Sequence, residues 1–147
     1  MKKNILKGIY AVTPDGLSEE TLYKKVYKLL EKGVSILQYR DKFRSPKQKI
    51  IIAKELRNIC NKFDSLLIIN DDAKLAKKVG ANGVHLGQKD MLCGEARNIL
   101  GPDSIIGISC QNNLSLAFNA QSEGADYVAF GSLFSTKSKA DVLHCSL

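Results

Sequence analysis

The chain has no tryptophan and only three prolines in its 147 residues, and none of its four cysteines forms a CxxC pair. The cysteines also lack a metal-type spacing to either histidine, which disfavours a disulfide scaffold or a zinc ribbon and indicates free thiols. No segment approaches the roughly 20 apolar residues that span a bilayer. The opening residues, MKKNILKGIYAVT, lack the apolar core and cleavage site of a secretory signal. We therefore expect a cytoplasmic protein with no membrane partner.

Arginine is also scarce. The net charge of +7 therefore comes mainly from lysines, which are scattered along the chain. Proteins that bind nucleic acid usually concentrate basic residues on one face or segment and interleave them with aromatics. This chain has no such segment. A scattered positive field suits small anionic molecules equally well. We expect small-molecule ligands and no nucleic acid.

Six short apolar runs alternate with longer amphipathic stretches, which is typical of a parallel α/β fold. The expected strands cover residues 9–13, 34–39, 66–70, 83–86, 104–109 and 126–131. Helix signals lie between them: Ser18 opens the first helix, and Ser45 followed by Pro46 opens the second. Further helices are expected over residues 72–79, 94–100 and 113–123.

Two helix-to-strand junctions repeat one phrase, which is VGANGVHL at residues 79–86 and EGADYVAF at residues 123–130. In each phrase a glycine ends a helix, and an alanine and a polar residue precede the next strand. This is the turn chemistry of a repeated βα unit. His85, inside the first phrase, fits a buried supporting position better than a catalytic one.

Polar and charged side chains collect at the carboxyl ends of the expected strands. The second strand is followed by Gln38, Arg40 and Lys42, and the later strands are followed by Asn70, Asp71, Gln88, Asp90, Ser109, Thr136, Lys137, Ser138 and Lys139. In a closed barrel these ends converge on one mouth, whereas in an open sheet they spread along a wide edge. The grouping therefore favours a β/α barrel of the TIM type.

Two interpretations of the mouth remain open on the residues alone. Asp71 and Asp90 could simply form salt bridges or cap the helices that follow them. Alternatively, they hold a hard divalent ion, and the ion binds a polyphosphate together with Arg40, Lys42 and Lys139, in the way that Mg²⁺ is usually held. Each polar residue also has an ordinary explanation as a turn, strand-end or loop residue.

Four segments taken together resemble thiamine-phosphate synthase, a family of β/α-barrel enzymes of thiamine biosynthesis. They are QYRDK (38–42), LLIINDDAKLAKKVGANGVHLGQKD (66–90), GPDSIIGIS (101–109) and GADYVAFGSLFSTKSKAD (124–141). The resemblance implies a transferase that condenses 4-amino-2-methyl-5-hydroxymethylpyrimidine diphosphate with a thiazole phosphate, giving thiamine phosphate and diphosphate. It also implies Mg²⁺ and a dissociative mechanism, in which diphosphate leaves before the thiazole nitrogen attacks a pyrimidine-methyl cation.

The same resemblance implies a role for each site residue. The pyrimidine diphosphate site would be lined by Gln38, Tyr39, Arg40, Asp41, Lys42 and Asn70. The Mg²⁺ ligands would be Asp71 and Asp90. Ser109 would contact the pyrimidine and Lys139 its diphosphate, while the thiazole phosphate would be held by Thr136, Lys137 and Ser138. No nucleophilic side chain is implied.

The chain departs from the family pattern in two places. Lys137 lies in a loop that is rich in proline in the family, and Cys110 and Gln111 replace a threonine and a histidine. More seriously, a barrel of this type has eight strands and only six are found. We expect a partial barrel domain over residues 1–141 and an irregular tail over residues 142–147.

The two missing strands would leave the first and sixth strands with unpaired edges. We therefore expect low stability, weak or no turnover, or self-association of copies through these edges. Two alternatives to the transferase remain. One is a related barrel that isomerises the thiazole carboxylate phosphate, which needs no diphosphate cradle, and the other is a non-catalytic phosphate-binding fragment.

Overall fold

The computed structural model describes residues 6–132, in which strands and helices alternate strictly. The elements are β1 (Ile9–Val12), α1 (Glu19–Glu31), β2 (Val34–Tyr39), α2 (Pro46–Lys62), β3 (Leu66–Asn70), α3 (Ala73–Val79), β4 (Gly83–Leu86), α4 (Cys93–Leu100), β5 (Ile105–Gln111), α5 (Leu114–Ser122) and β6 (Tyr127–Phe130). All expected elements are confirmed, with ends that agree to within about two residues. The predicted tail lies outside the described residues.

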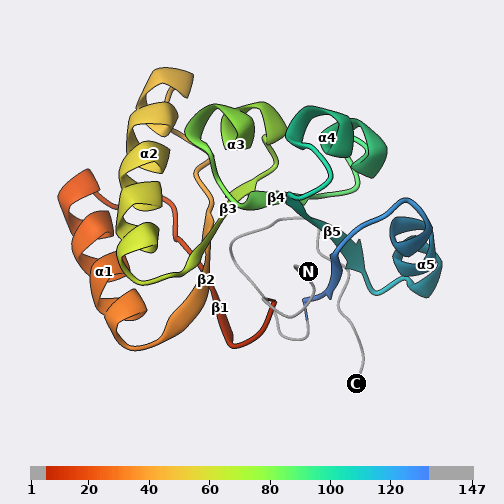
Figure 1. The fold of residues 1–147 in the computed structure, drawn as a ribbon, viewed down its shortest axis with the longest axis horizontal. Coiled ribbons are helices and arrows are strands. Elements are labelled where there is room, and N and C mark those ends of the chain that lie inside the picture. The colour runs from red at the N-terminus through yellow and green to blue at the C-terminus, as the bar shows by residue number, and fades with distance from the viewer. Residues whose placement is uncertain (1–5, 133–147) are drawn as a thin grey trace.

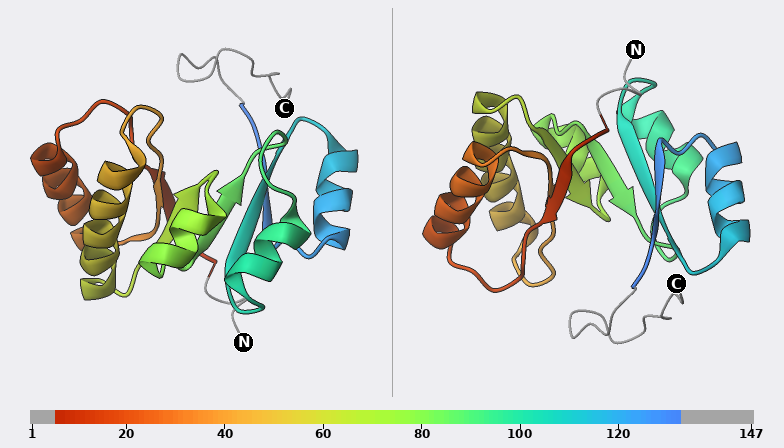
Figure 2. Two further views of the ribbon diagram at one scale, coloured as in Figure 1. Left: turned by 90° about the horizontal axis from the view of Figure 1, so that it is seen from above. Right: turned by 90° about the horizontal axis from the view of Figure 1, so that it is seen from below.

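The six strands form one parallel sheet in sequential order, β1 to β6. The sheet is curled, and the helices cover its outer side (Figures 1 and 2). The prediction of an incomplete TIM-type barrel is therefore confirmed, with six strands and five helices in this part of the chain. Within residues 6–132, no helix is long and apolar enough to cross a membrane.

Apolar side chains lie on both faces of the curled sheet. The larger cluster lies between the strands and the helices and includes Leu37, Leu56 and Ile106. A smaller cluster, formed by Ile36, Ile68 and Ile105, closes the floor of the inner face. Because successive strand residues point to opposite faces, the residues after these isoleucines alternate between the barrel interior and the helix layer. This alternation decides which side chains reach the inner cavity.

The repeated phrase builds the same bridge twice. Asn82 Oδ1 accepts hydrogen bonds from the Leu67 N–H at 2.9 Å and from an arginine of α2 at 2.9 Å. Asp126 Oδ2 accepts from the Ile106 N–H at 2.8 Å and from an arginine of α4 at 2.8 Å. Each polar residue therefore ties the start of one strand to the next strand and to a helix, which confirms a repeated βα architecture.

Candidate active site

A cavity of about 820 Å³ opens on the inner face of the sheet, near the carboxyl ends of the strands. Its walls come from β1, β2, β3, β4 and β6, so residues that are distant in sequence meet there. The polar side chains in its lining include Tyr10, Gln38, Arg40, Asn70, His85 and Tyr127. Of the residues predicted at the strand ends, Gln38, Arg40 and Asn70 converge on this cavity.

Strand alternation divides the segment Gln38–Lys42 between two sides. Gln38 and Arg40 line the cavity. Tyr39 is buried in the outer core and its hydroxyl donates to Asp41 Oδ2 at 3.1 Å. These two residues instead border a smaller hollow of about 130 Å³ beside α2 and α3, which Lys42 also lines. Of the five residues predicted to line one substrate site, the structure therefore directs Tyr39 and Asp41 toward the helix layer.

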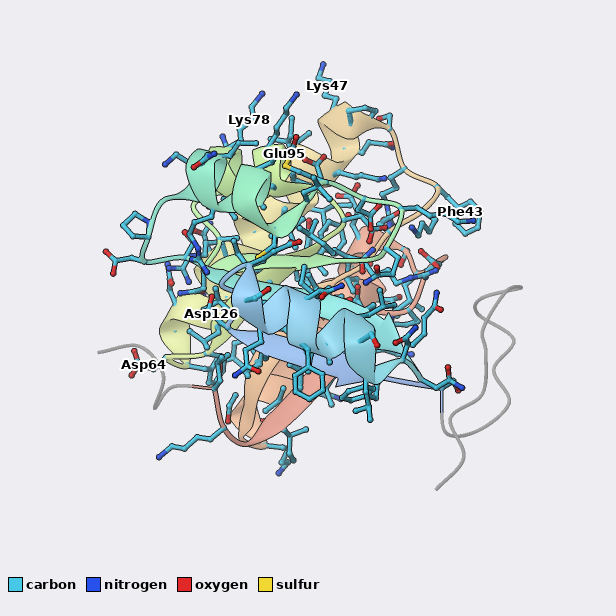
Figure 3. All side chains as sticks on the ribbon, turned by 90° about the vertical axis from the view of Figure 1, so that its right-hand side faces the viewer. Phe43, Lys47, Asp64, Lys78, Glu95 and Asp126 are labelled. Atoms are coloured by element: carbon cyan, nitrogen blue, oxygen red, sulfur yellow. The ribbon has the colours of Figure 1, made fainter. Side chains whose placement is uncertain are left out.

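The carboxylate of Asp41 is fully engaged by its own loop. It forms an ion pair with Arg44 at 2.5 Å and accepts hydrogen bonds from the N–H groups of Phe43 and Arg44 at 3.1 and 3.0 Å. Burial alone would raise the pKa of Asp41, but these hydrogen bonds outweigh it and lower the pKa from 3.8 to about 2. Phe43 itself points away from the body of the protein (Figure 3).

Asp41 should therefore make the stability of the protein sensitive to acid. Because its pKa is lower in the folded state, its ionised form contributes roughly 2 kcal/mol above the ordinary pKa, and this contribution is lost as the pH falls toward the folded value. Urea unfolding from about pH 7 to about pH 2 measures it. Asp41→Asn should lose stability at neutral pH and show a shallower decline below about pH 4, whereas the exposed Asp64→Asn should keep the wild-type slope. Coincident slopes for wild type and Asp41→Asn would contradict the assignment.

The loop after β1 fastens the segment Gln38–Lys42. Asp15 forms an ion pair with Arg40 and accepts from the Lys42 N–H at 2.9 Å. Thr13 Oγ1 accepts from the Arg40 N–H at 2.9 Å and donates to the Arg40 carbonyl at 3.0 Å. The sequence reasoning missed Thr13 and Asp15. They follow the first strand just as the predicted residues follow the others, so the same rule would have found them.

Asp71 and Asp90 face each other across the ends of β3 and β4. Lys42 Nζ lies 2.5 Å from Asp71 Oδ2, and Asp90 Oδ2 accepts from the Gly87 N–H at 2.7 Å. Burial raises the pKa of Asp90, the hydrogen bond from Gly87 lowers it, and a hydrogen bond and charge repulsion from Asp71 raise it again. Asp71 has a left-handed backbone, with a φ of 64°, which aspartate tolerates better than most residues. The two carboxyl groups therefore contact each other, although Asp71 borders the hollow that Lys42 lines and Asp90 borders a second hollow of about 130 Å³ beside α4 and α5.

This donor set fits a magnesium ion. Within residues 6–132, no group of three or more His, Cys, Asp or Glu side chains could hold a metal. At this point the protein offers the two carboxyl groups of Asp71 and Asp90, which contact each other. Mg²⁺ prefers oxygen ligands and usually takes one or two carboxylates, with water and substrate phosphate completing its shell.

Ser109 is held from two sides. Its hydroxyl lies 2.8 Å from Nε2 of His85, and its carbonyl accepts from Gln88 Nε2 at 2.6 Å. Tyr10 and Tyr127, which lie in the cavity wall, were missed by the sequence reasoning, although a tyrosine inside a short apolar strand is a usable signal. The predicted residues Thr136, Lys137, Ser138 and Lys139 lie outside the described residues.

The parallel strands, the outer helices and the charged strand ends define a protein of the β/α-barrel class. A family model described as thiamine monophosphate synthase matches residues 9–146. The chain therefore belongs to the thiamine monophosphate synthase family of transferases.

Individual relatives agree. The chain is 46% identical over 143 residues to thiamine-phosphate synthase from Thioalkalivibrio sulfidiphilus, covering 97% of this chain and 68% of that protein. It is 45% identical to the enzyme of the same name from Nitrosococcus oceani, covering 97% of this chain and 66% of that protein. The chain thus spans about two thirds of the length of these relatives.

Solved structures agree with the barrel fold, and one of them also agrees with the family. A thiamine phosphate pyrophosphorylase from Pyrococcus furiosus superimposes with a TM-score of 0.81 and 33% sequence identity, over 97% of this chain and 67% of that chain. An N-acetylneuraminate lyase from Fusobacterium nucleatum superimposes with a TM-score of 0.64 at 16% identity, over 84% of this chain and 44% of that chain. The second likeness concerns the fold alone.

Proposed function

We propose that this chain forms the pyrimidine diphosphate site of a thiamine-phosphate synthase. The carrying observation is the cluster of Lys42, Asp71 and Asp90 at the ends of three neighbouring strands, beside a cavity large enough for a small ring. The reaction joins 4-amino-2-methyl-5-hydroxymethylpyrimidine diphosphate to 4-methyl-5-(2-phosphoethyl)thiazole or its carboxylate. Its products are thiamine phosphate and diphosphate.

In this proposal the ring and the diphosphate occupy different parts of the mouth. The amides of Gln38 and Asn70, with the Ser109 hydroxyl, hydrogen-bond the aminopyrimidine in the cavity. Arg40 and Lys42 attract the diphosphate, and Asp15 keeps the Arg40 guanidinium in place.

Asp71 and Asp90 would hold Mg²⁺, and the ion, when bound, supplies positive charge to the oxygens of the departing diphosphate. Lys42, which contacts Asp71 in the structure, adds a second positive charge at the same point. Charge develops on the leaving oxygen only as the bond breaks, so these groups stabilise the transition state more than the ground state. Thr136, Lys137 and Ser138 as the thiazole phosphate site, and Lys139 as a diphosphate contact, stay predictions.

Isothermal titration with the pyrimidine diphosphate tests this proposal directly. We expect binding that Mg²⁺ tightens by at least about tenfold, because Asp71 and Asp90 would hold the ion and its positive charge would attract the diphosphate. Binding, and not turnover, is the appropriate readout, since weak or no turnover is our prediction for this chain.

The controls separate the alternatives. Inorganic diphosphate that binds as tightly as the pyrimidine diphosphate would favour a non-catalytic phosphate-binding fragment. Binding of the thiazole carboxylate phosphate, with none of the pyrimidine diphosphate, would favour the isomerising barrel. Either result would overturn the proposal.

A further inference from the structure

A continuous chain of five side chains crosses the inner face of the sheet. Gln38 Nε2 donates to the Tyr10 hydroxyl at 2.8 Å, and that hydroxyl lies 2.7 Å from the hydroxyl of Tyr127. The Tyr127 hydroxyl lies 3.0 Å from Nδ1 of His85, and Nε2 of His85 lies 2.8 Å from Ser109 Oγ. The chain therefore begins and ends at residues predicted to bind the pyrimidine.

The chain is built into the interior of the barrel. Gln38 is 6% exposed and His85 is 8% exposed. The ring of Tyr127 stacks on His85 with centroids 5.6 Å apart, and it lies against Gly107, where a Cβ would come within 2.0 Å of the tyrosine ring. A glycine at position 107 is therefore required for Tyr127 to occupy this place.

Both phenols keep their protons. Burial raises the pKa of Tyr10 and of Tyr127, and the neighbouring Tyr10 raises the pKa of Tyr127 further. Each hydroxyl thus has one proton to donate and lone pairs to accept with. A row in which every hydroxyl accepts from one neighbour and donates to the other takes its direction from the donor at its end.

The direction follows from Gln38, because its amide nitrogen can only donate. In such a row Tyr10 accepts from Gln38 and donates its own proton to Tyr127. Tyr127 then donates to Nδ1 of His85, which has to be unprotonated, so the single proton of a neutral ring lies on Nε2 and is donated to Ser109. Because the Ser109 oxygen accepts from His85, the proton of the Ser109 hydroxyl is not used within the row.

We infer that this chain fixes His85 as the Nε2–H tautomer and thereby makes the Ser109 hydroxyl a hydrogen-bond donor toward the ligand. His85, Tyr10 and Tyr127 are then positioning residues that act through Ser109. The identity of the ligand rests on the proposed function. The atom that Ser109 contacts must be an acceptor, which in the pyrimidine diphosphate is a ring nitrogen or a phosphate oxygen.

The tautomer is measured on the wild-type chain without any ligand. Long-range ¹H–¹⁵N correlation spectra, with the His85 signals assigned by their loss in His85→Gln, should show a proton on Nε2 and none on Nδ1. Gln38→Leu, which removes the first donor, should shift His85 toward a mixture of tautomers. An Nδ1–H tautomer in the wild type would make His85 the donor to Tyr127 and would overturn the inference.

Binding tests whether the chain acts through Ser109. Tyr127→Phe and Ser109→Ala should each weaken pyrimidine diphosphate binding about fivefold to tenfold, the worth of one hydrogen bond. The double variant should bind no worse than Ser109→Ala alone, whereas additive losses would overturn the inference. Tyr23→Phe, which removes a tyrosine hydroxyl from α1, should bind like the wild type.

Two further ligands identify the acceptor. If the Ser109→Ala loss is seen with the pyrimidine alcohol, the acceptor is a ring nitrogen, and if it is seen with inorganic diphosphate, the acceptor is a phosphate oxygen. A wild type that binds none of these ligands but shows the Nε2–H tautomer would sink the proposed function and leave the tautomer assignment intact.

Discussion

Asp71→Asn should abolish the Mg²⁺ dependence of pyrimidine diphosphate binding. Because the variant should lose the whole Mg²⁺ effect, it should bind at least about tenfold more weakly than the wild type in the presence of Mg²⁺. Without Mg²⁺ the substitution should not weaken diphosphate binding. The variant should then bind the diphosphate at least as tightly as the wild type, because a negative charge has been removed and Lys42 no longer contacts a carboxylate.

Asparagine is the right replacement because the backbone of Asp71 is left-handed, a conformation that asparagine also tolerates. Asp90→Asn should behave in the same way, since the two carboxyl groups contact each other. Isothermal titration at matched ionic strength, with and without Mg²⁺, measures both variants. Circular dichroism establishes that each variant is folded.

Asp72→Asn is the matched control. The side chain of Asp72 caps α3 by accepting from the Leu75 N–H at 2.8 Å, and asparagine caps a helix equally well. The same charge is therefore removed one residue away without disturbing the carboxylate pair. If Asp72→Asn lost the Mg²⁺ effect as completely as Asp71→Asn, general charge and not a metal site would explain the result.

The sequence predicted the fold almost completely because its signals are local. Each strand is a compact apolar run, and caps such as Ser18 and Ser45 mark the helix starts, with Ser45 and Gln48 forming a reciprocal capping box. The repeated phrase also predicted a structural repeat that the bridges of Asn82 and Asp126 confirm. These features depend on neighbouring residues, so one chain is enough to read them.

The candidate site was only partly predictable, because its contacts join residues that are far apart in sequence. The rule that polar residues follow the strands correctly brought Gln38, Arg40 and Asn70 to the cavity. It did not reveal that Tyr39 faces the helix layer, which depends on the register of β2 against its neighbours. The contact between Tyr10 and Tyr127 spans 117 positions and requires the curvature of the whole sheet.

Gly83→Ala should be the most destabilising single substitution of a glycine in the sheet. Gly83 pairs with Ile105 across β4 and β5, and an added Cβ would lie 1.9 Å from the carbonyl oxygen of Ile105. The obstacle is backbone and not a flexible side chain, so the strands must move apart. We expect a loss of about 3 kcal/mol in the free energy of unfolding, measured by urea denaturation.

Gly94→Ala tests whether this cost comes from the clash or from the loss of a glycine. Gly94 lies in α4 with no atom within 4 Å of an added Cβ, so alanine should stabilise the helix by about 0.5 kcal/mol. The two substitutions add the same methyl group and should have opposite signs. Because β4 and β5 carry His85 and Ser109, Gly83→Ala should also weaken pyrimidine diphosphate binding, whereas Gly94→Ala should not. Equal stability for Gly83→Ala and the wild type would mean that the close approach of β4 and β5 is not needed to hold the site together.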